Sequence, residues 1–446
     1  MKRIGYVILL VLAFTGCGLL PAEPTPTPTL LPMPELETAV SSPTPETETA
    51  EIETAELFLP FTSTEPGTAT PAPTPEPEPT PTIDLTPSPT PLPAFPPYDG
   101  PPLRRSDIGI QVHMFEEEQN WIFEHLNIMG VGWVKVQLAW KLYQPEPGGY
   151  HMERIEELDR FIERANGDNI QVMLGLAKAP EWSRTTTEED GPPADYALFR
   201  EFAFFLADRY RGQVAAYELW NESNLRREWN GQRLHGAELV ALTREGAAGI
   251  RAGDPNAIII SAGPATTGIN DGVTAVDDRV YLEQMLAAGI ANIVDGIGVH
   301  PYGWANPALS RLGDGTTPSP SHNNHSSFFF RNTIEDYLTL LDRYGVSQQL
   351  WVTEFGWGSV ENFSGGPAPE APFMNYVSEW EQAVYTMDAF ALAHENERMG
   401  PMMLWNLNFA PLLGPEASKA GYSVVRPDGS PRPLYLALQY VPRAGP

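Results

Sequence analysis

Residues 132–140 read GWVKVQLAW, residues 152–165 read MERIEELDRFIERA, and residues 170–176 read IQVMLGL. The first and third stretches are short and largely apolar, which is typical of buried strands. In the middle stretch apolar residues recur every three or four positions, which indicates an amphipathic helix. This strand–helix–strand unit predicts two parallel strands joined by a crossover helix.

The same alternation occurs eight times between residues 108 and 441. The expected strands cover residues 108–114, 132–140, 170–176, 214–220, 257–262, 294–299, 349–353 and 402–407. The expected helices cover residues 121–129, 152–165, 194–210, 236–252, 279–288, 328–344, 377–395 and 433–441. An open doubly wound sheet is the alternative, but no GxGxxG or Walker sequence follows any strand. We therefore predict an α/β fold, a single (β/α)8 TIM barrel.

The N-terminal part of the chain has a different composition. Residues 18–102 contain 24 prolines and 13 acidic residues and no Lys or Arg, which predicts a disordered linker. Residues 1–17 form a signal-peptide pattern of a basic start, an apolar run and Thr15-Gly16-Cys17. This pattern resembles a bacterial lipoprotein processing site with Cys17 as the lipidated residue, and an ordinary secretory signal is the alternative. Residues 103–446 remain as the folded domain, which we expect to be held outside the cytoplasm, on a membrane or cell surface.

Charge and cysteine content exclude several classes of function. The net charge is −29, and about −18 of it belongs to residues 103–446, so a nucleic-acid partner is not expected. A single cysteine allows no intrachain disulfide and no Cys-based metal site. His322 and His325 have ligand-like spacing but lie in a polar loop. We expect a monomer without metal or cofactor, acting on a neutral or weakly charged substrate.

In a (β/α)8 barrel the residues just past each strand face a shared cleft. Two carboxylates, Glu222 and Glu354, directly follow the apolar fourth and seventh strands. A single Glu at a strand end is more often a solvated surface residue. Strands four and seven, however, lie on roughly opposite sides of the barrel mouth. Two carboxylates that flank a bond in this way are the requirement of glycoside hydrolysis.

Aromatic and polar residues at the other strand ends point to the same chemistry. Tryptophans at these positions can stack on the apolar faces of sugar rings, while polar side chains bind the hydroxyl groups. The candidate substrate-binding residues are His113, Trp140, Glu181, Trp182, Asn221, His300, Tyr302, Trp357, Trp405 and Asn408. Two long loops, residues 303–327 and 358–375, are expected on the same face of the barrel.

The motifs Trp220-Asn221-Glu222 and Thr353-Glu354-Phe355 resemble those of clan A glycoside hydrolases, the retaining (β/α)8 enzymes. This resemblance implies Glu222 as acid/base, Glu354 as nucleophile, and a Tyr302 hydroxyl on the nucleophile. Within the clan, 180–182 and 405–406 look most like family 39 or related cellulase and xylosidase-type members. Many members carry an Arg on strand two that supports the nucleophile. Here Lys135 is the candidate, and its role stays open.

The sequence therefore predicts a retaining O-glycoside hydrolase that cleaves an extracellular oligo- or polysaccharide with two Glu residues. The mechanism requires a protonated Glu222, and we expect tryptophans and the Glu354 charge to raise its pKa. The first alternative is a surface-anchored carbohydrate-binding barrel without catalysis. A metal-dependent barrel hydrolase is the second. Binding alone would not require an opposed pair of carboxylates, which favours the enzyme.

Overall fold

Eight parallel strands form a closed barrel in the computed structural model of the chain, which describes residues 93–445. They follow one another around the barrel in sequence order, and the last strand pairs with the first. The strands are β1 (Ile108–Val112), β2 (Trp133–Ala139), β3 (Gln171–Ala177), β4 (Ala216–Leu219), β5 (Ile258–Ser261), β6 (Gly296–Val299), β7 (Gln349–Phe355) and β8 (Met399–Leu404). The predicted single (β/α)8 barrel is confirmed.

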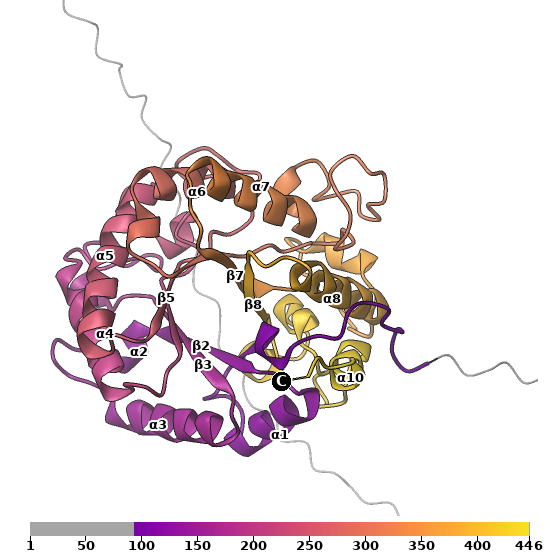
Figure 1. Ribbon diagram of the computed structural model, residues 1–446, viewed down its shortest axis with the longest axis horizontal. Coiled ribbons are helices and arrows are strands. Elements are labelled where there is room, and N and C mark those ends of the chain that lie inside the picture. Colours follow the sequence, from indigo (N-terminus) through magenta and orange to yellow (C-terminus); the bar gives the residue numbers. More distant parts are fainter. Residues whose placement is uncertain (1–92, 446) are drawn as a thin grey trace, which may run out of the picture. The chain divides into compact units, whose positions relative to one another are not determined.

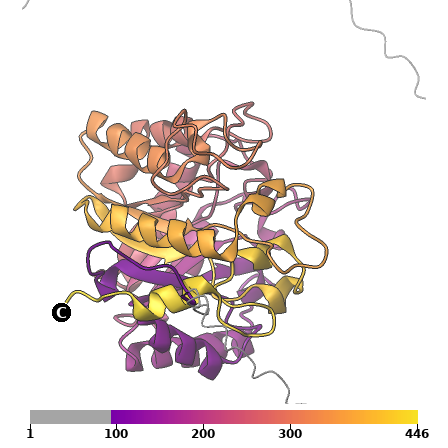
Figure 2. The same cartoon turned by 90° about the vertical axis from the view of Figure 1, so that its right-hand side faces the viewer.

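Helices surround the strands (Figure 1). The main ones are α1 (Gln119–Met129), α3 (Met152–Gly167), α4 (Ala197–Arg209), α5 (Gly236–Gly253), α6 (Asp278–Ala287), α7 (Phe330–Arg343), α8 (Glu379–His394) and α10 (Pro433–Tyr440). Each lies in a stretch whose apolar periodicity predicts a helix. Figure 2 shows this ring from the side, with long orange and yellow loops gathered at the right.

The end of the eighth strand differs from the prediction. The apolar stretch continues to Leu407, but β8 spans Met399–Leu404. Beyond this point the chain stays beside the neighbouring strand β1, where the Leu407 amide donates to the Gln111 carbonyl (2.9 Å). Leu407 is buried, which explains why hydropathy alone extends the strand. Short helices follow two strands, α2 (Trp140–Tyr143) after β2 and α9 (Ala410–Leu413) after β8.

The interior of the barrel is built in layers. An apolar cluster holds Trp133, Met173, Ala216, Ile260, Trp351 and Met403. Two positions further along β2 and β4 stand Lys135 and Glu218, both fully buried and joined by an ion pair of 2.7 Å. Gly175 on β3 lies beside this pair, and a Cβ there would lie 3.4 Å from both side chains. The barrel thus carries a charged layer between its apolar floor and its open mouth.

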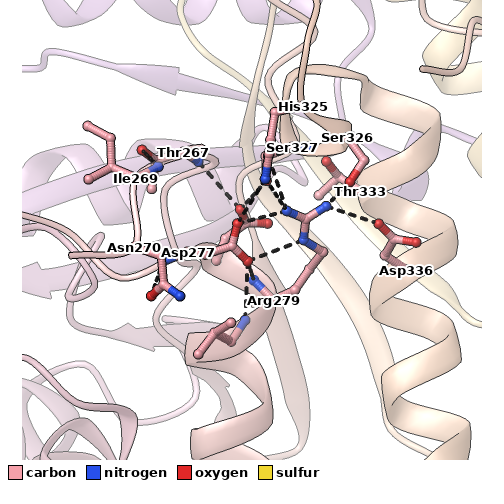
Figure 3. Close-up of polar contacts among 12 residues, drawn as sticks. Thr267, Ile269, Asn270, Asp277, Arg279, His325, Ser326, Ser327, Thr333 and Asp336 are labelled. Carbon is pink, nitrogen blue, oxygen red and sulfur yellow. Dashed lines mark hydrogen bonds and ion pairs between the residues drawn. The ribbon is translucent and has the colours of Figure 1, made fainter. Parts of the chain in front are cut away.

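The long loop after β6 is tied to the start of α6. In Figure 3 the Arg279 guanidinium lies between Asp277, at 2.7 Å, and Asp336 of α7, at 3.3 Å, and it also contacts His325 and Ser326 of this loop. Next to it the buried Asp278 carboxylate accepts a hydrogen bond of 2.5 Å from the Ser327 hydroxyl. These contacts fix the C-terminal end of the loop, and its other end reaches the barrel mouth.

Residues before the expected domain start also pack on the barrel. The Phe95 ring stacks on Tyr440 with centroids 5.3 Å apart, and Tyr98 packs against the same core. The signal sequence with Cys17 and residues 18–92 of the expected linker lie outside the described residues. Within residues 93–445, no helix combines the length and apolar character needed to cross a bilayer.

Candidate active site

Glu222 and Glu354 meet at the open end of the barrel. Glu354 is buried and lies one residue before the end of β7. Glu222 follows β4, and its side chain is 13% exposed. One oxygen of each carboxylate and one ring nitrogen of His300 all lie within 4.8 Å of one another. The nearest oxygens of the two carboxyl groups are thus no more than 4.8 Å apart, which fits the ~5–5.5 Å spacing of carboxyl groups in retaining glycosidases and not the ~6.5–9.5 Å of inverting enzymes.

Glu354 is held from both sides. The Lys135 ammonium donates to its Oε1 at 3.2 Å and to the Thr353 carbonyl at 3.0 Å. The Tyr302 hydroxyl donates to its Oε2 at 3.1 Å. Both oxygens of the Glu354 carboxyl group are thus held by hydrogen bonds, one of them from a cation. The structure thus places Lys135 where it supports Glu354, the role that the sequence leaves open.

The charge of Lys135 is itself maintained by its surroundings. Burial alone would lower the pKa of the ammonium, but the carboxylates of Glu218 and Glu354 outweigh it and raise the pKa. Burial would in turn raise the pKa of Glu218, and Lys135 together with His300 lowers it to about 2. Sequence reasoning missed Glu218. The available signal was a pair of opposite charges, Lys135 and Glu218, inside two otherwise apolar strands.

His300 lies at the centre of the cluster, behind the two candidate catalytic residues. Its Nδ1 is 3.3 Å from Glu222 Oε1, and its Nε2 is 3.1 Å from the Thr353 hydroxyl. Burial would lower its pKa, but the Glu354 charge and hydrogen bonds to Glu218 and Glu222 raise it to about 9. The surrounding carboxyl groups thus favour the charged form of the His300 imidazole.

The environment of Glu222 overturns the expectation of a raised pKa. Burial does act in that direction. It is outweighed by the hydrogen bond and charge of His300 and, after these, by Arg227, and together they lower the pKa of Glu222. Arg227 Nη2 lies 3.1 Å from Glu222 Oε2. Both neighbours thus favour the charged form of Glu222 in this geometry.

The spacing of Glu222, Glu354 and His300 would also suit a metal ion. Such an ion would share the cluster with the ammonium of Lys135, which lies 3.2 Å from Glu354. Lys135 and His300 are basic groups that pair with the carboxyl groups of the cluster, and this arrangement is suited to acid–base and nucleophilic chemistry.

A cavity of about 710 Å³ opens above the two carboxylates. Six of the predicted site residues line it: His113, Asn221, Glu222, Tyr302, Glu354 and Trp405. Lining residues that sequence reasoning did not assign to the site include Gln111, Gln137, Lys178, Arg227, Glu228, Thr266, Phe373 and Tyr422. Several of these come from loops whose paths a sequence pattern does not define.

The other predicted binding residues do not line this cavity. Trp140 is buried and stacks on Phe202 at 5.0 Å. Trp357 is buried and donates to the Asn306 carbonyl. Both rings pack against neighbouring residues and do not face the cavity. A position just past a strand therefore does not determine which way its side chain turns. The other four predicted binding residues are also absent from the cavity lining. They are Glu181, Trp182, Asn408 and the buried His300.

Part of the cavity wall is aromatic. Trp405 lies beside Tyr422 and Phe409, with centroids 5.3 and 5.1 Å away, and Trp304 from the loop after β6 contacts Phe373. His322 stacks on Trp304 at 4.2 Å. Flat rings beside polar groups form a surface that can bind a sugar ring on its apolar face and through its hydroxyl groups.

The chain is similar to solved structures of glycoside hydrolases. The sequence identities are low, so this likeness shows a shared fold. A family 39 enzyme from the gut symbiont Bacteroides cellulosilyticus WH2 aligns with a TM-score of 0.55 and 19% identity, covering 77% of this chain and 65% of that one. A family 5 enzyme (GH5_18) from Streptomyces cattleya, in complex with GlcNAc, aligns with a TM-score of 0.53 and 14% identity, covering 77% and 80%.

No curated protein matches the sequence. A family model described as cellulase, glycosyl hydrolase family 5, matches residues 104–410, most of the described domain. The residues that carry the clan A resemblance lie within this range, and so do both carboxylates at the barrel mouth. The chain belongs to the cellulase family of glycoside hydrolases, glycosyl hydrolase family 5.

Proposed function

We propose that the protein hydrolyses a glycosidic bond with retention of the anomeric configuration, using Glu354 as nucleophile and Glu222 as acid/base. The observation that carries this proposal is the short separation of the two carboxylates across the cavity. Carboxyl groups whose nearest oxygens lie within 4.8 Å of each other leave room for a sugar carbon bonded to one of them, but not for the extra water of an inverting enzyme.

In the first step a Glu354 oxygen attacks the anomeric carbon while Glu222 gives its proton to the leaving oxygen, and the glycosidic bond breaks. In the second step Glu222 takes a proton from water, whose oxygen displaces Glu354 from the sugar. Lys135 and Tyr302 hold the Glu354 carboxyl group in place through hydrogen bonds to its two oxygens. Asn221, which lines the cavity with a buried and unpaired Oδ1, is positioned to bind a sugar hydroxyl.

The substrate that we propose is an extracellular oligo- or polysaccharide of low charge, bound between Trp405 and the loops after β6 and β7. Aryl glycosides and polysaccharides of several sugars would be incubated with the protein, with the anomer formed first read by NMR. Release of the retained anomer supports the proposal. Binding without hydrolysis of any of them would support the carbohydrate-binding alternative, and an inverted product would overturn the mechanism.

The roles of the two carboxylates can be separated with leaving groups. With an activated aryl leaving group, Glu222→Ala should form the glycosyl-enzyme and stall, and azide should restore turnover because it needs no general base. The product would be the β-glycosyl azide from a β-glycoside. Glu354→Ala should lose activity with every leaving group. Azide rescue of Glu354→Ala with inverted product, and none of Glu222→Ala, would exchange the roles.

We also propose that the mature protein is anchored outside the cytoplasm by a lipid on Cys17. The basic start, the apolar run and the following proline-rich stretch support this proposal. Metabolic labelling with an alkyne fatty acid in a bacterial host should label the protein, and Cys17→Ala should abolish the label. An unlabelled wild-type protein in the medium would indicate the ordinary secretory signal.

A further inference from the structure

Arg227 lies at the edge of the cavity and is held loosely. It belongs to the short 3-10 helix η3 (Arg226–Glu228) after β4. Its neighbour Arg226 donates to three backbone carbonyls, those of Val273, Trp229 and Gln232. By contrast, the side chain of Arg227 is 64% exposed, and among the described residues its hydrogen bond is the one to Glu222. The backbone of η3 is thus fixed, while the guanidinium of Arg227 is held by this one hydrogen bond.

In its present position Arg227 opposes the chemistry that Glu222 must perform. A general acid has to hold a proton before it donates one. Arg227 and His300 both stabilise the charged form of Glu222, and burial does not compensate for them. The charged and titratable groups around Glu222 are His300 and Tyr302 after β6, Glu354 on β7, Lys178 after β3, and Arg227 and Glu228 on η3.

A second partner for Arg227 is already in place. Glu228 lines the same cavity, and its Oε2 is buried without a hydrogen-bond partner among the described residues. Burial raises the pKa of Glu228 to about 7, although Lys178 and Arg227 act against this. Its backbone carbonyl accepts a hydrogen bond from Trp220 at 3.0 Å, which fixes its place. A guanidinium that left Glu222 would find an acceptor one residue away.

We propose that Arg227 is a positioning residue with two positions, on Glu222 in the empty site and on Glu228 when a leaving-group sugar fills the cavity. Departure of Arg227 removes one of the two cations beside Glu222, while His300 stays in place, and this makes it easier for Glu222 to take a proton from solvent and pass it to the leaving oxygen. The acid form of Glu222 is thereby favoured when substrate is bound. This inference rests on the proposed function, because it assumes that Glu222 serves the leaving-group side.

The first test measures protonation directly and requires no activity. Full-length protein labelled with [5-13C]glutamate is titrated by NMR, with the Glu222 signal identified by its loss in Glu222→Gln. We expect Arg227→Gln to raise the midpoint of Glu222 by at least about one pH unit, a tenfold change in acid dissociation, and Arg227→Lys to restore most of it. Lys419→Ala is the matched control, because it removes a cavity-lining cation that lies over Phe409 instead. Equal midpoints in wild type and Arg227→Gln would overturn the proposal.

The second test uses aryl glycosides of good and poor leaving ability. Arg227→Gln should move the alkaline limb of kcat/KM upward by at least about one pH unit with the poor leaving group. Glu228→Gln removes the second acceptor and should lower kcat at least about fivefold more for the poor leaving group than for the good one. An equal loss of kcat on both substrates would show that Arg227 does not move to Glu228. If no glycoside were cleaved while the NMR midpoint still moved, the proposed function would fail and the Arg227–Glu222 pairing would stand.

Discussion

Replacement of Lys135 by Met tests the charged layer inside the barrel. Lys135 is fully buried, 2.7 Å from Glu218 and 3.2 Å from Glu354. At an effective dielectric constant near 20, each contact corresponds to an attraction of about 5–6 kcal/mol, from which the desolvation of each ion subtracts several kcal/mol. Removing one partner of a buried pair typically costs about 3–5 kcal/mol, because the other charge is left uncompensated. We expect Lys135→Met to lower the free energy of unfolding by this amount at pH 7.

The pH dependence of this loss has a definite sign. In the wild type the pKa of Glu218 is lowered to about 2, so its contribution is present above the unfolded pKa and lost as pH falls toward 2. Without Lys135, burial raises the folded pKa of Glu218 instead. The deficit of Lys135→Met should therefore be larger at pH 8 than at pH 5. Urea denaturation followed by circular dichroism at both pH values measures it.

A second substitution separates stability from activity. Glu218→Gln in the Lys135→Met background removes the stranded charge and should recover at least about 1–2 kcal/mol of stability. It should not restore hydrolysis, because Glu354 still lacks its cation. An unchanged stability of Lys135→Met would show that the barrel interior tolerates the unpaired carboxylates, which would refute the reasoning. Recovery of activity in the double variant would show that Lys135 does not support Glu354.

Three other predictions concern the surroundings of the site. A Cβ at Gly263 would lie 2.4 Å from the His300 ring; Gly263→Ala should displace His300 and lower kcat at least about tenfold, and full activity in this variant would contradict the tight contact. Arg279→Ala should destabilise the protein by about 1–3 kcal/mol and speed proteolysis of the loop after β6; unchanged cleavage would show that Arg279 does not anchor it. A protein starting at residue 93 should melt higher than one starting at residue 103, which loses the Phe95–Tyr440 stack, and equal melting temperatures would show that this stack contributes nothing.

The barrel could be predicted because its signal is local and repeated. Each strand is a short apolar stretch and each main helix has an apolar stripe, and eight such pairs close into one ring. The end of β8 could not be predicted, since Leu407, three residues past the end of the strand, is an apolar residue as fully buried as those of the strand. Hydropathy reports burial in both cases and does not distinguish a strand from a buried turn.

The candidate site could be predicted in part. Glu222 and Glu354 follow strands, and parallel strands bring their carboxyl ends to one face, so their proximity follows from topology. The direction in which a side chain at a strand end points does not follow from topology. Trp405 lines the cavity while Trp140 and Trp357 pack against other helices and loops, because local turns after each strand rotate equivalent positions differently.

The sequence by itself determined the eightfold alternation, the two carboxylates and the family to which the chain belongs. Tertiary structure alone decided the charge state of the site. Lys135 reaches a carboxylate 219 residues away, and His300 with Arg227 lowers the pKa of Glu222 where the sequence suggests a raised one. The physical reason is that a pKa depends on the distances to charges from several strands at once, and those distances exist only after the barrel has closed.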